Sequence, residues 1–415
     1  MVDDPMNIRG LKRFAVDNME RDYRPHMAPK TGRRIAIVGG GPAGLSAAYY
    51  LTVMGHDVTI FEARRHLGGM LRYGIPSYRL PRERLQAEID WIVGLGVHVE
   101  YESKVEDISR LREDFDGTYI AIGAHRDRKL GLEGEDATGV LSAVEMLRCI
   151  GDGMAPDFTH ERVCVVGGGN VAMDVARSAV RCGADKVSIV YRRRVTDMTA
   201  QDEEIEGARA EGCELLTLNA PLRIVAENGA VTGLAVQPQI IGGFRGGRPA
   251  PRPADTAERI IPCDRVVVAI GQAIESAPFE AQGIPCDHGR FVANEDGTVD
   301  GFEGVFVGGD CQSGPATVIR AVNAGKVAAA NIDHYLGFEH LIDKHNVDMP
   351  PVKFKGKTSC ARCEMTNREA ADRVGDWELV ERGLTAQEAH QEAARCLRCD
   401  HFGHGAFRGG RVMTW

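Results

Sequence analysis

Two glycine-rich segments of the sequence, "VGGGPAG" at residues 38–44 and "VGGGNVA" at residues 166–172, have the spacing of phosphate-binding turns. In the first segment, Gly39 permits a tight turn, Gly41 lets backbone N–H groups approach a pyrophosphate, and Gly44 allows a helix to pack against the preceding strand. The N-terminus of that helix would direct the positive end of its dipole at the phosphates. Each segment therefore predicts a site for a ligand that contains a pyrophosphate.

The elements around the first turn complete the pattern of a dinucleotide site. Residues 33–38 form a β-branched run that predicts a strand, residues 43–55 are rich in helix formers and close on Gly55, and residues 56–65 predict a second strand that ends at Glu62. An acid about 20 residues after such a turn hydrogen-bonds the ribose of a bound dinucleotide. We expect Glu62 to have this role.

The second turn repeats the order of strand, turn, helix and strand, but it ends differently. Tyr191 stands where Glu62 stands in the first copy, and three arginines follow it at residues 192–194. A guanidinium there can pair with a ribose 2′-phosphate, which a carboxylate would repel. The second turn therefore predicts a nicotinamide dinucleotide site that favours NADP. The alternative is that these arginines form a solvated turn beside a site for either nucleotide.

Three further segments are expected to connect the two modules. Residues 117–128 and 264–272 contain buried-looking strands that end in Ile-Gly, at matching places after the two turns. Residues 303–332 predict a strand, then Asp310, then a helix that begins near Pro315. An aspartate in that place can bind a ribityl hydroxyl while the helix amides meet a flavin ring. The alternative for Asp310 is an ordinary acid in a turn.

The composition limits the classes of protein to consider. A chain of 415 residues with 43% hydrophobic and 26% charged residues is expected to fold into two or three soluble domains. Its net charge of −9 argues against nucleic acid as a partner, because phosphate contacts need a basic face. The N-terminus lacks the apolar core of a signal peptide, and no apolar run reaches the roughly 18 residues of a membrane span. We expect a cytoplasmic protein with no membrane contact.

The order of the motifs resembles that of one family. "GGGPAG", "GGMLRYGIPSYRLP", "GGGNVAMD", "YRRR", "AIGQ" and "GGDCQSGPAT" follow one another as in the two-nucleotide-domain flavoproteins, specifically the glutamate synthase small-subunit branch. The resemblance implies an α/β fold with two Rossmann-like dinucleotide-binding domains, in which an NAD(P) domain is inserted into an FAD domain. The expected parts are an N-terminal helical arm (1–30), the FAD domain (31–155 and 276–340), the NAD(P) domain (156–275) and a C-terminal cysteine-containing tail (341–415).

The resemblance also implies which residues hold each cofactor. The residues expected at FAD are Gly39, Gly41, Pro42, Ala43, Gly44, Glu62, Gly69, Met70, Leu71, Arg79, Val105, Ala121, Gly123, Gly309, Asp310 and Thr317. The residues expected at NAD(P)H are Gly167, Gly169, Asn170, Val171, Ala172, Arg192, Arg193 and Gly271. Some NADP-using relatives carry a further arginine where this chain has Thr199, so the choice between NAD and NADP stays open. No catalytic acid or base is expected, because hydride transfer is the cofactors' own chemistry.

The cysteines indicate how electrons leave the flavin. Neither residues 66–76 nor residues 164–275 contain a Cys-x-x-Cys pair, so thiol chemistry at the flavin is not expected. The tail contains two such pairs, Cys360 with Cys363 and Cys396 with Cys399. Four thiolates could hold a [4Fe–4S] cluster or zinc. The alternative is a docking tail whose ligands are vestigial.

A flavoprotein without an acceptor of its own is most simply a subunit of a larger complex. The resemblance implies that it exchanges single electrons with iron–sulfur and catalytic subunits. By analogy, the preferred hypothesis is the NAD-reducing subunit of a tungsten aldehyde oxidoreductase complex. The second hypothesis is a glutamate synthase small subunit. The third, of another class, is a non-catalytic flavin-binding assembly or redox-sensing subunit.

Overall fold

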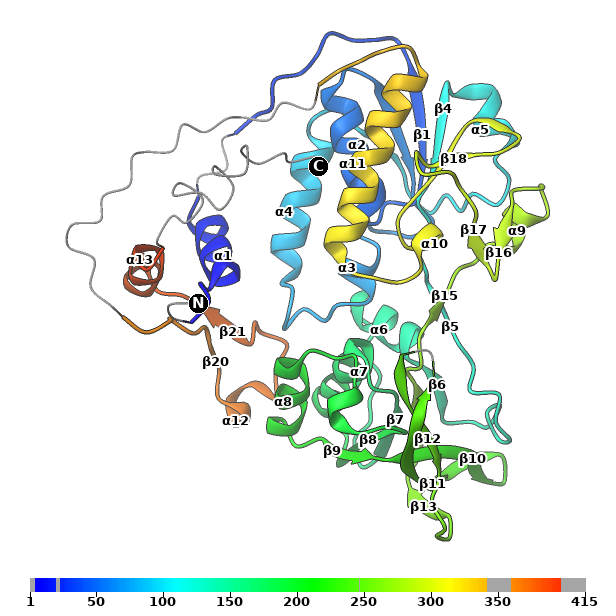
Figure 1. Ribbon diagram of the computed structural model, residues 1–415, viewed down its shortest axis with the longest axis vertical. Helices are drawn as coiled ribbons and strands as arrows, with labels where there is room; N and C mark the ends of the chain where they lie inside the picture. Colours follow the sequence, from blue (N-terminus) through cyan, green and yellow to red (C-terminus); the bar gives the residue numbers. More distant parts are fainter. Residues whose placement is uncertain (1–3, 20–22, 246, 342–359, 397–415) are drawn as a thin grey trace. The chain divides into compact units, whose positions relative to one another are not determined.

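The structure is a computed structural model that describes residues 4–19, 23–245, 247–341 and 360–396 (Figure 1). Their backbone contacts divide the chain into two compact units. The larger unit contains residues 26–342 and 370–378, and the smaller unit contains the N-terminal segment and the remainder of the tail. Each unit is described by itself.

The first parallel sheet of the larger unit carries the first glycine turn. Its strand order is β18-β19-β4-β1-β2-β3, and every pair is parallel except β18 with β19. The strands are β1 (Arg34–Val38), β2 (Asp57–Phe61), β3 (His98–Glu100), β4 (Gly117–Ile120), β18 (Thr298–Val299) and β19 (Phe302–Val307). Strands far apart in sequence are neighbours here, since β19 pairs with β4. The segments before and after the second turn therefore form one domain.

Helices α2 (Pro42–Val53), α4 (Arg82–Val93) and α11 (Val318–Tyr335) pack against this sheet, and α2 lies beside α11 (Figure 1). The two helices approach closely because their contact surface consists of small residues. A Cβ added to Gly325 of α11 would lie 2.9 Å from the backbone nitrogen of Ala47 in α2. This packing fixes the N-terminus of α2 at the first glycine turn.

The second parallel sheet carries the second glycine turn, in the order β6-β14-β7-β8-β9. Its strands are β6 (Val140–Ser142), β7 (Arg162–Val166), β8 (Lys186–Tyr191), β9 (Glu214–Thr217) and β14 (Arg265–Val268). Helices α6 (Ala143–Gly151), α7 (Asn170–Arg181) and α8 (Asp202–Ala210) accompany it. Strand β6 precedes the expected start of the NAD(P) domain at residue 156, yet it pairs with β14 in this sheet. The two parallel-sheet domains confirm the predicted α/β fold.

An antiparallel sheet that the motifs did not indicate follows β9. It consists of β10 (Asn219–Glu227), β11 (Ala230–Arg245), β12 (Arg248–Pro253) and β13 (Arg259–Pro262). Strand β11 pairs with all three of the others, so β11 and β12 form a long hairpin. A separate two-stranded ladder of β5 (Arg126–Asp127) and β15 (Gln272–Ala273) joins the chain segments that enter and leave the second domain.

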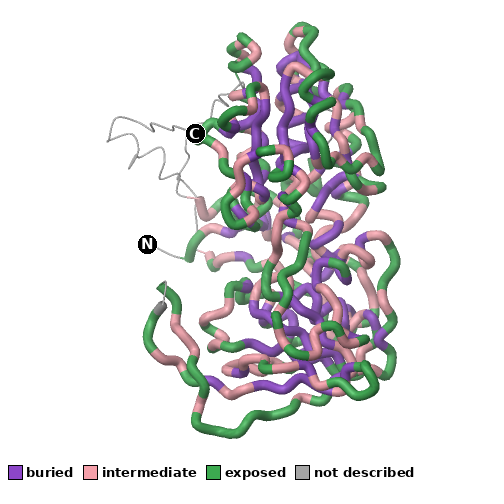
Figure 2. The backbone as a smooth tube through the Cα atoms, turned by 90° about the vertical axis from the view of Figure 1, so that its right-hand side faces the viewer, coloured by how far each residue is buried: buried purple, intermediate pink, exposed green. Residues whose placement is uncertain are grey.

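Shorter elements complete the larger unit. They are α3 (Met70–Tyr73), α5 (Ser109–Asp114), η1 (Val195–Asp197), α9 (Ala277–Glu280), β16 (Cys286–Asp287), β17 (Arg290–Phe291), α10 (Asp310–Ser313) and α12 (Ala370–Arg373). The helix expected near Pro315 begins at Val318, because Gly314 has a positive φ of 82° and separates α10 from α11. Buried residues run through the strands of both parallel sheets (Figure 2).

The smaller unit is organised around one buried carboxylate. It contains α1 (Ile8–Asn18), β20 (Thr366–Asn367), β21 (Glu381–Gly383) and α13 (Ala386–Ala394). Glu392 of α13 is fully buried and accepts the backbone N–H groups of Asn7 (2.7 Å) and Cys363 (2.8 Å). The N-terminal arm and the tail therefore fold together. Within the described residues, no helix combines the length and apolar character needed to cross a membrane.

Candidate functional site

The first glycine turn joins β1 to α2 and requires glycine for two separate reasons. Gly39 has a φ of 104°, and a Cβ added there would lie 2.6 Å from the carbonyl oxygen of Ala121. A Cβ on Gly44 would collide with the carbonyl oxygen of Gly39. The turn therefore lies flat against the neighbouring strand, and α2 starts at Pro42 with its N-terminus at the turn.

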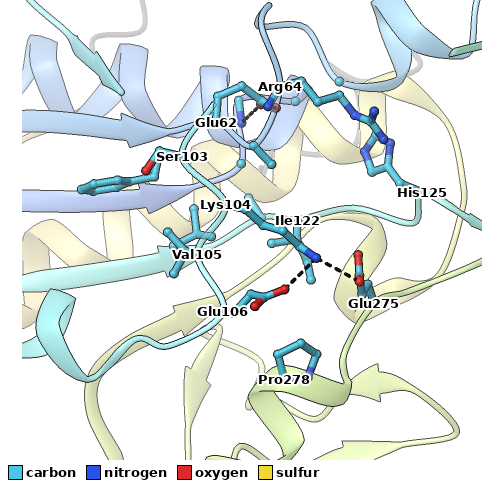
Figure 3. A pocket seen from close by; sticks show the side chains of 18 of the residues that line it. Glu62, Arg64, Ser103, Lys104, Val105, Glu106, Ile122, His125, Glu275 and Pro278 are labelled. Atoms are coloured by element: carbon cyan, nitrogen blue, oxygen red, sulfur yellow. Dashed lines mark hydrogen bonds and ion pairs between the residues drawn. The ribbon is translucent and has the colours of Figure 1, made fainter. Parts of the chain in front are cut away.

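Glu62 lies directly after β2 and is fixed against this turn. Its Oε2 accepts the N–H of Gly40 at 2.8 Å, and its Oε1 accepts the N–H of Arg64 at 2.9 Å (Figure 3). Burial raises the pKa of Glu62, and the two backbone hydrogen bonds oppose that rise. The carboxylate is thus held in one orientation beside the glycine turn, where an adenosine ribose would need an acceptor.

A cavity opens at this turn. Glu62, Gly69, Val105 and Ala121 line it together with the turn glycines 39–41. These predicted FAD residues are therefore brought together. The combination of a glycine turn, an oriented acid and an apolar wall fits the adenosine diphosphate half of a dinucleotide.

The far wall of this cavity contains residues that the motifs did not reveal. Lys104 bridges Glu106 (2.8 Å) and Glu275 (3.1 Å) between two loops (Figure 3). Burial, and then the charge of Arg64, lower the pKa of His125 to about 4, so this imidazole is neutral at neutral pH. These residues come from loops without a local motif, so no signal in the sequence identifies them.

The other residues predicted at FAD have different positions. Pro42 and Ala43 begin α2, Met70 and Leu71 begin α3, and Thr317 is the N-cap residue of α11. Burial raises the pKa of Asp310 in α10, and a hydrogen bond from the Ala316 backbone opposes the rise. Met70 also contacts the other domain, since the Nε2 of Gln272 lies 3.8 Å from its sulfur. Gly123 and Gly309 both have positive φ values, of 66° and 79°.

Arg79 lies outside the residues that line the two cavities described here. Its Nη1 contacts both carboxylate oxygens of Asp174 in α7, and its Nε contacts Glu204 in α8 at 2.8 Å. These contacts join the loop before α4 to the second domain. They give Arg79 a structural role, separate from the FAD contact that the resemblance implies.

The second glycine turn has the same construction, with alanine in place of the last glycine of the pattern. Gly167 has a φ of 155°, and a Cβ added there would collide with the carbonyl oxygen of Ala269. Ala172 stands where the first turn has Gly44 and is fully buried. Asn170 begins α7 and its Oδ1 accepts the N–H of Gln201 at 2.9 Å. This turn therefore has room for the methyl group of Ala172 in place of a glycine.

Tyr191 fills the place that the acid occupies in the first domain. A Cβ added to Gly168 would lie 2.5 Å from its ring, and its hydroxyl donates to the backbone carbonyl of Asp197 at 2.9 Å. Thr199 donates its N–H to the carbonyl of Gly168 at 3.0 Å. Thr199 therefore lies at the glycine turn itself, beside Gly169.

A second cavity extends from this turn. Predicted residues Gly167, Gly169, Asn170, Val171, Arg192, Arg193 and Gly271 line it. Pro315 and Ala316, which precede α11 of the first domain, line it as well. The cavity is therefore shared by both dinucleotide domains. Arg248 of β12 is a further lining residue that the motifs missed, because it lies in the antiparallel sheet and far from the arginine cluster in sequence.

The tail cysteines lie partly within the described residues. Cys360, Cys363 and Cys396 belong to the smaller unit, whereas Cys399 lies outside the described residues. Arg395 donates through Nε to the carbonyl oxygen of Cys360 at 3.1 Å. Cys360 is thus adjacent to Arg395, which immediately precedes Cys396 in the chain.

Within the described residues, His56, Asp333 and His340 form a group whose ligand atoms could surround one ion. Asp333 Oδ1 lies 2.9 Å from His56 Nε2 and 2.7 Å from His340 Nδ1. The N–H of His340 also donates to Asp333 Oδ2 at 2.8 Å. These are hydrogen-bond distances, so we interpret the group as a buried polar cluster that ties α11 to the segment after it.

Two dinucleotide domains with a glycine turn and a cavity in each define a class, the two-domain flavin and nicotinamide oxidoreductases. The chain belongs to the pyridine nucleotide-disulphide oxidoreductase family, whose model matches residues 12–325. This result confirms the predicted family relationship. The family is one of pyridine nucleotide oxidoreductases, so the match supports an FAD-dependent NAD(P)H oxidoreductase with FAD and NAD(P)H as cofactors.

Curated relatives are similar along most of the chain. The beta subunit of NADP(+)-dependent formate dehydrogenase from Moorella thermoacetica is 37% identical over 97% of this chain and 63% of its own length. The beta subunit of NADPH-Fe(3+) oxidoreductase from Geobacter sulfurreducens is 35% identical over 96% of this chain and 66% of its own length. The glutamate synthase [NADPH] small chain of Escherichia coli is 32% identical over 80% and 75%. The chain thus spans just under two thirds of the first two relatives.

Solved structures show the same fold. FprA from Mycobacterium tuberculosis in complex with NADPH has a TM-score of 0.64 at 20% identity, over 74% of this chain and 85% of its own. Thioredoxin reductase from T. acidophilum has a TM-score of 0.56 at 21% identity, over 74% and 99%. At these identities the likeness concerns the fold alone.

Proposed function

We propose that this chain transfers hydride between a nicotinamide nucleotide and FAD, and that it exchanges single electrons with iron–sulfur clusters of a partner subunit. One observation supports the proposed hydride transfer. The cavity at the second glycine turn is also lined by Pro315 and Ala316 of the FAD domain. A dinucleotide whose pyrophosphate lies at Gly169 would therefore extend its other end toward the FAD domain.

The residues of this chain would bind the two cofactors and orient them toward each other. We assign the pyrophosphate of FAD to Gly39, Gly41 and the start of α2, and its ribose to Glu62. When both cofactors are bound, they supply the chemistry, a hydride of two electrons and one proton that moves between nicotinamide and flavin, followed by two one-electron steps to the partner. The protein's contribution is to hold the two reacting rings in contact, which removes most of the entropic cost of the encounter.

The remaining predicted ligands keep the same assignment as proposals. At FAD they are Pro42, Ala43, Gly44, Gly69, Met70, Leu71, Arg79, Val105, Ala121, Gly123, Gly309, Asp310 and Thr317. At the nicotinamide nucleotide they are Gly167, Gly169, Asn170, Val171, Ala172, Arg192, Arg193 and Gly271. The cavity positions support the assignment of the lining residues as cofactor ligands. The assignment of Arg79 lacks this support, because its guanidinium is engaged with Asp174 and Glu204.

The partner is proposed from the relatives. Each of the first two carries the name of a beta subunit, and the third is a small chain of glutamate synthase. We propose that this chain also works beside a catalytic subunit, with an aldehyde oxidoreductase as the preferred partner and the large subunit of glutamate synthase as the second candidate. Four tail cysteines, Cys360, Cys363, Cys396 and Cys399, are proposed to hold a [4Fe–4S] cluster or zinc.

Anaerobic titration tests the hydride-transfer half. The FAD-loaded chain is mixed with NADH or NADPH, and the visible absorbance of the flavin is followed. We expect at least one nucleotide to bleach the flavin. A Gly167→Ala variant should lose this bleaching yet still be reduced by dithionite, because the added Cβ distorts the nucleotide turn and leaves FAD in place. A flavin that dithionite bleaches but neither nucleotide does would favour the redox-sensing or assembly hypothesis.

Co-purification tests the other half. The native complex, isolated from its source through a tag on this chain, should contain a subunit with iron–sulfur clusters. Its catalytic subunit distinguishes an aldehyde oxidoreductase from a glutamate synthase. If the chain purifies alone, or with subunits that contain no iron, the proposed single-electron exchange is wrong.

A further inference from the structure

We propose that Arg248, on the hairpin of β11 and β12, completes a 2′-phosphate site with Arg192 and Arg193 and makes NADP(H) the preferred nucleotide. This inference rests on the proposed function, because it concerns the same cavity. It assigns a specificity-determining role to a residue outside both glycine motifs and outside the arginine cluster that follows β8.

The structure ties Arg248 to the end of β8. Its Nη2 donates to the backbone carbonyl of Asp197 at 2.9 Å and lies 3.5 Å from the hydroxyl of Tyr191. The tyrosine hydroxyl donates to the same carbonyl. Arg193 reaches back in the other direction, since its Nε donates to the carbonyl of Pro249 at 2.8 Å. The hairpin is thereby fastened to the segment that holds the adenosine ribose in dinucleotide domains.

The cavity wall is strongly basic. Its charged lining residues are Arg128, Lys129, Arg192, Arg193 and Arg248, and no aspartate or glutamate lines it. The cavity at the first turn is different, since it is lined by three glutamates, Glu62, Glu106 and Glu275. A basic wall without acids attracts a phosphate dianion and offers little to a neutral ribose hydroxyl.

Within the described part of the chain, Arg192, Arg193 and Arg248 form no ion pair with a carboxylate, whereas the neighbouring Arg194 does. The guanidinium of Arg194 donates two hydrogen bonds to the carboxylate of Asp197, from Nε at 2.9 Å and from Nη2 at 3.0 Å. The three remaining guanidiniums keep their charge available to a ligand. Arginine suits this role because its planar group can donate two hydrogen bonds to one phosphate.

The position of Thr199 explains why the third arginine of the proposed 2′-phosphate site is supplied by a distant part of the sequence. The resemblance to NADP-using relatives leads one to expect an arginine at this position. The backbone of Thr199 is bonded to Gly168, and its hydroxyl is close to Gly169, so the position belongs to the pyrophosphate turn. Tyr191 occupies the place of the ribose-binding acid. Arg248 lines the cavity and brings a further guanidinium next to Tyr191, since its Nη2 lies 3.5 Å from the tyrosine hydroxyl.

Binding to the oxidised, FAD-loaded chain tests the inference, because NADP+ and NAD+ bind there without transferring hydride. Isothermal titration calorimetry should give an affinity for NADP+ at least about tenfold higher than for NAD+. The Arg248→Ala variant should lose about tenfold in affinity for NADP+ and change its affinity for NAD+ by no more than about twofold. The Arg248→Lys variant should bind NADP+ with an affinity between those of the wild-type chain and Arg248→Ala, because lysine keeps the charge and loses the paired donors.

Arg252→Ala is the matched control, since Arg252 lies on the same strand, is exposed, and is not among the lining residues of the cavity. It should leave both affinities unchanged. Equal affinities of the wild-type chain for the two nucleotides would overturn the inference, and so would an Arg248→Ala variant that weakens both equally or neither. Flavin bleaching by NADH or NADPH would still support the proposed hydride transfer in those cases, so the two failures are distinguishable.

Discussion

Arg79 contacts both carboxylate oxygens of Asp174 through Nη1, at 2.9 and 2.8 Å, and so joins the loop before α4 of the FAD domain to α7 of the nucleotide domain. Asp174 is almost fully buried. Burial raises the pKa of its carboxyl group to about 7, although the charge of Arg79 opposes that rise. A carboxyl whose pKa is raised in the folded state favours folding only while it is protonated, so the stability falls as the pH rises from the ordinary aspartate value of 3.8 to about 7.

The first prediction follows from this pair. Arg79→Ala leaves the ionised Asp174 without its partner, so we expect a loss of about 3 kcal/mol in the free energy of unfolding at pH 8. The loss should be smaller at pH 6, where Asp174 can take up a proton. Urea denaturation at the two pH values measures the difference. Arg110→Ala, an exposed change on α5, is the control and should change stability little at either pH. A loss that is larger at pH 6 would contradict the assignment.

The second prediction concerns the first glycine turn. Gly39→Ala combines a positive φ with a Cβ only 2.6 Å from the Ala121 carbonyl, so the turn must shift away from the pyrophosphate position. We expect the purified variant to contain less than about a tenth of the FAD of the wild-type chain. Gly32→Ala is the matched control, since Gly32 also has a positive φ, of 74°, but has open space around it. The Gly32→Ala variant should retain FAD. Flavin absorbance measures the FAD content of both variants.

The third prediction concerns a buried carboxylate that three arginines share. Glu211 contacts Arg177 (2.8 Å), Arg181 (2.6 Å) and Arg373 (2.8 Å). Burial would raise its pKa, but the hydrogen bonds and charges of the arginines outweigh that effect, and the pKa lies below its usual value. A depressed carboxyl pKa contributes stability at neutral pH that is lost as the pH falls through the folded-state pKa.

Glu211→Gln should therefore lower the free energy of unfolding by about 3–5 kcal/mol at pH 7. The difference from the wild-type chain should shrink as the pH falls below the ordinary glutamate value of 4.5, because the unfolded wild-type chain takes up a proton there, and it should vanish once the folded carboxylate, whose pKa lies lower, is protonated too. Glu206→Gln on α8, the helix that ends just before Glu211, removes an exposed carboxylate that pairs with Arg209, and it should have little effect. A pH-independent difference for Glu211→Gln would show that its charge is not the cause.

The fourth prediction concerns the tail cysteines. If the cysteine pairs share a metal or cluster, Cys363→Ser should reduce the bound iron or zinc to less than about a third of the wild-type content. Cys286→Ser, a change in the FAD domain, should leave the metal content as it is. Elemental analysis of anaerobically purified protein measures both. Equal metal content in all three proteins would show that the tail does not use Cys363 as a ligand.

Much of the fold follows from local patterns. The strand, turn and helix around Gly39 and those around Gly167 were predicted from the glycine spacing and from the residue types on either side. Glycine is required there by backbone conformation and by close contact with the next strand. The same holds for Glu62, which the end of β2 delivers directly to the turn. The antiparallel sheet that begins at β10 was not predicted, since its strands carry no motif.

Glycine spacing and residue types are enough to predict that two dinucleotide turns are present and that they differ, one with an acid and one with Tyr191 and arginines. The residues that surround these turns depend on tertiary packing. Arg248 meets Asp197, and Arg193 meets Pro249, because the β11–β12 hairpin packs at the end of β8, and Arg79 meets Asp174 because two domains meet. Such contacts depend on the packing of whole elements, and side chains that meet through packing leave no periodicity or spacing in the sequence.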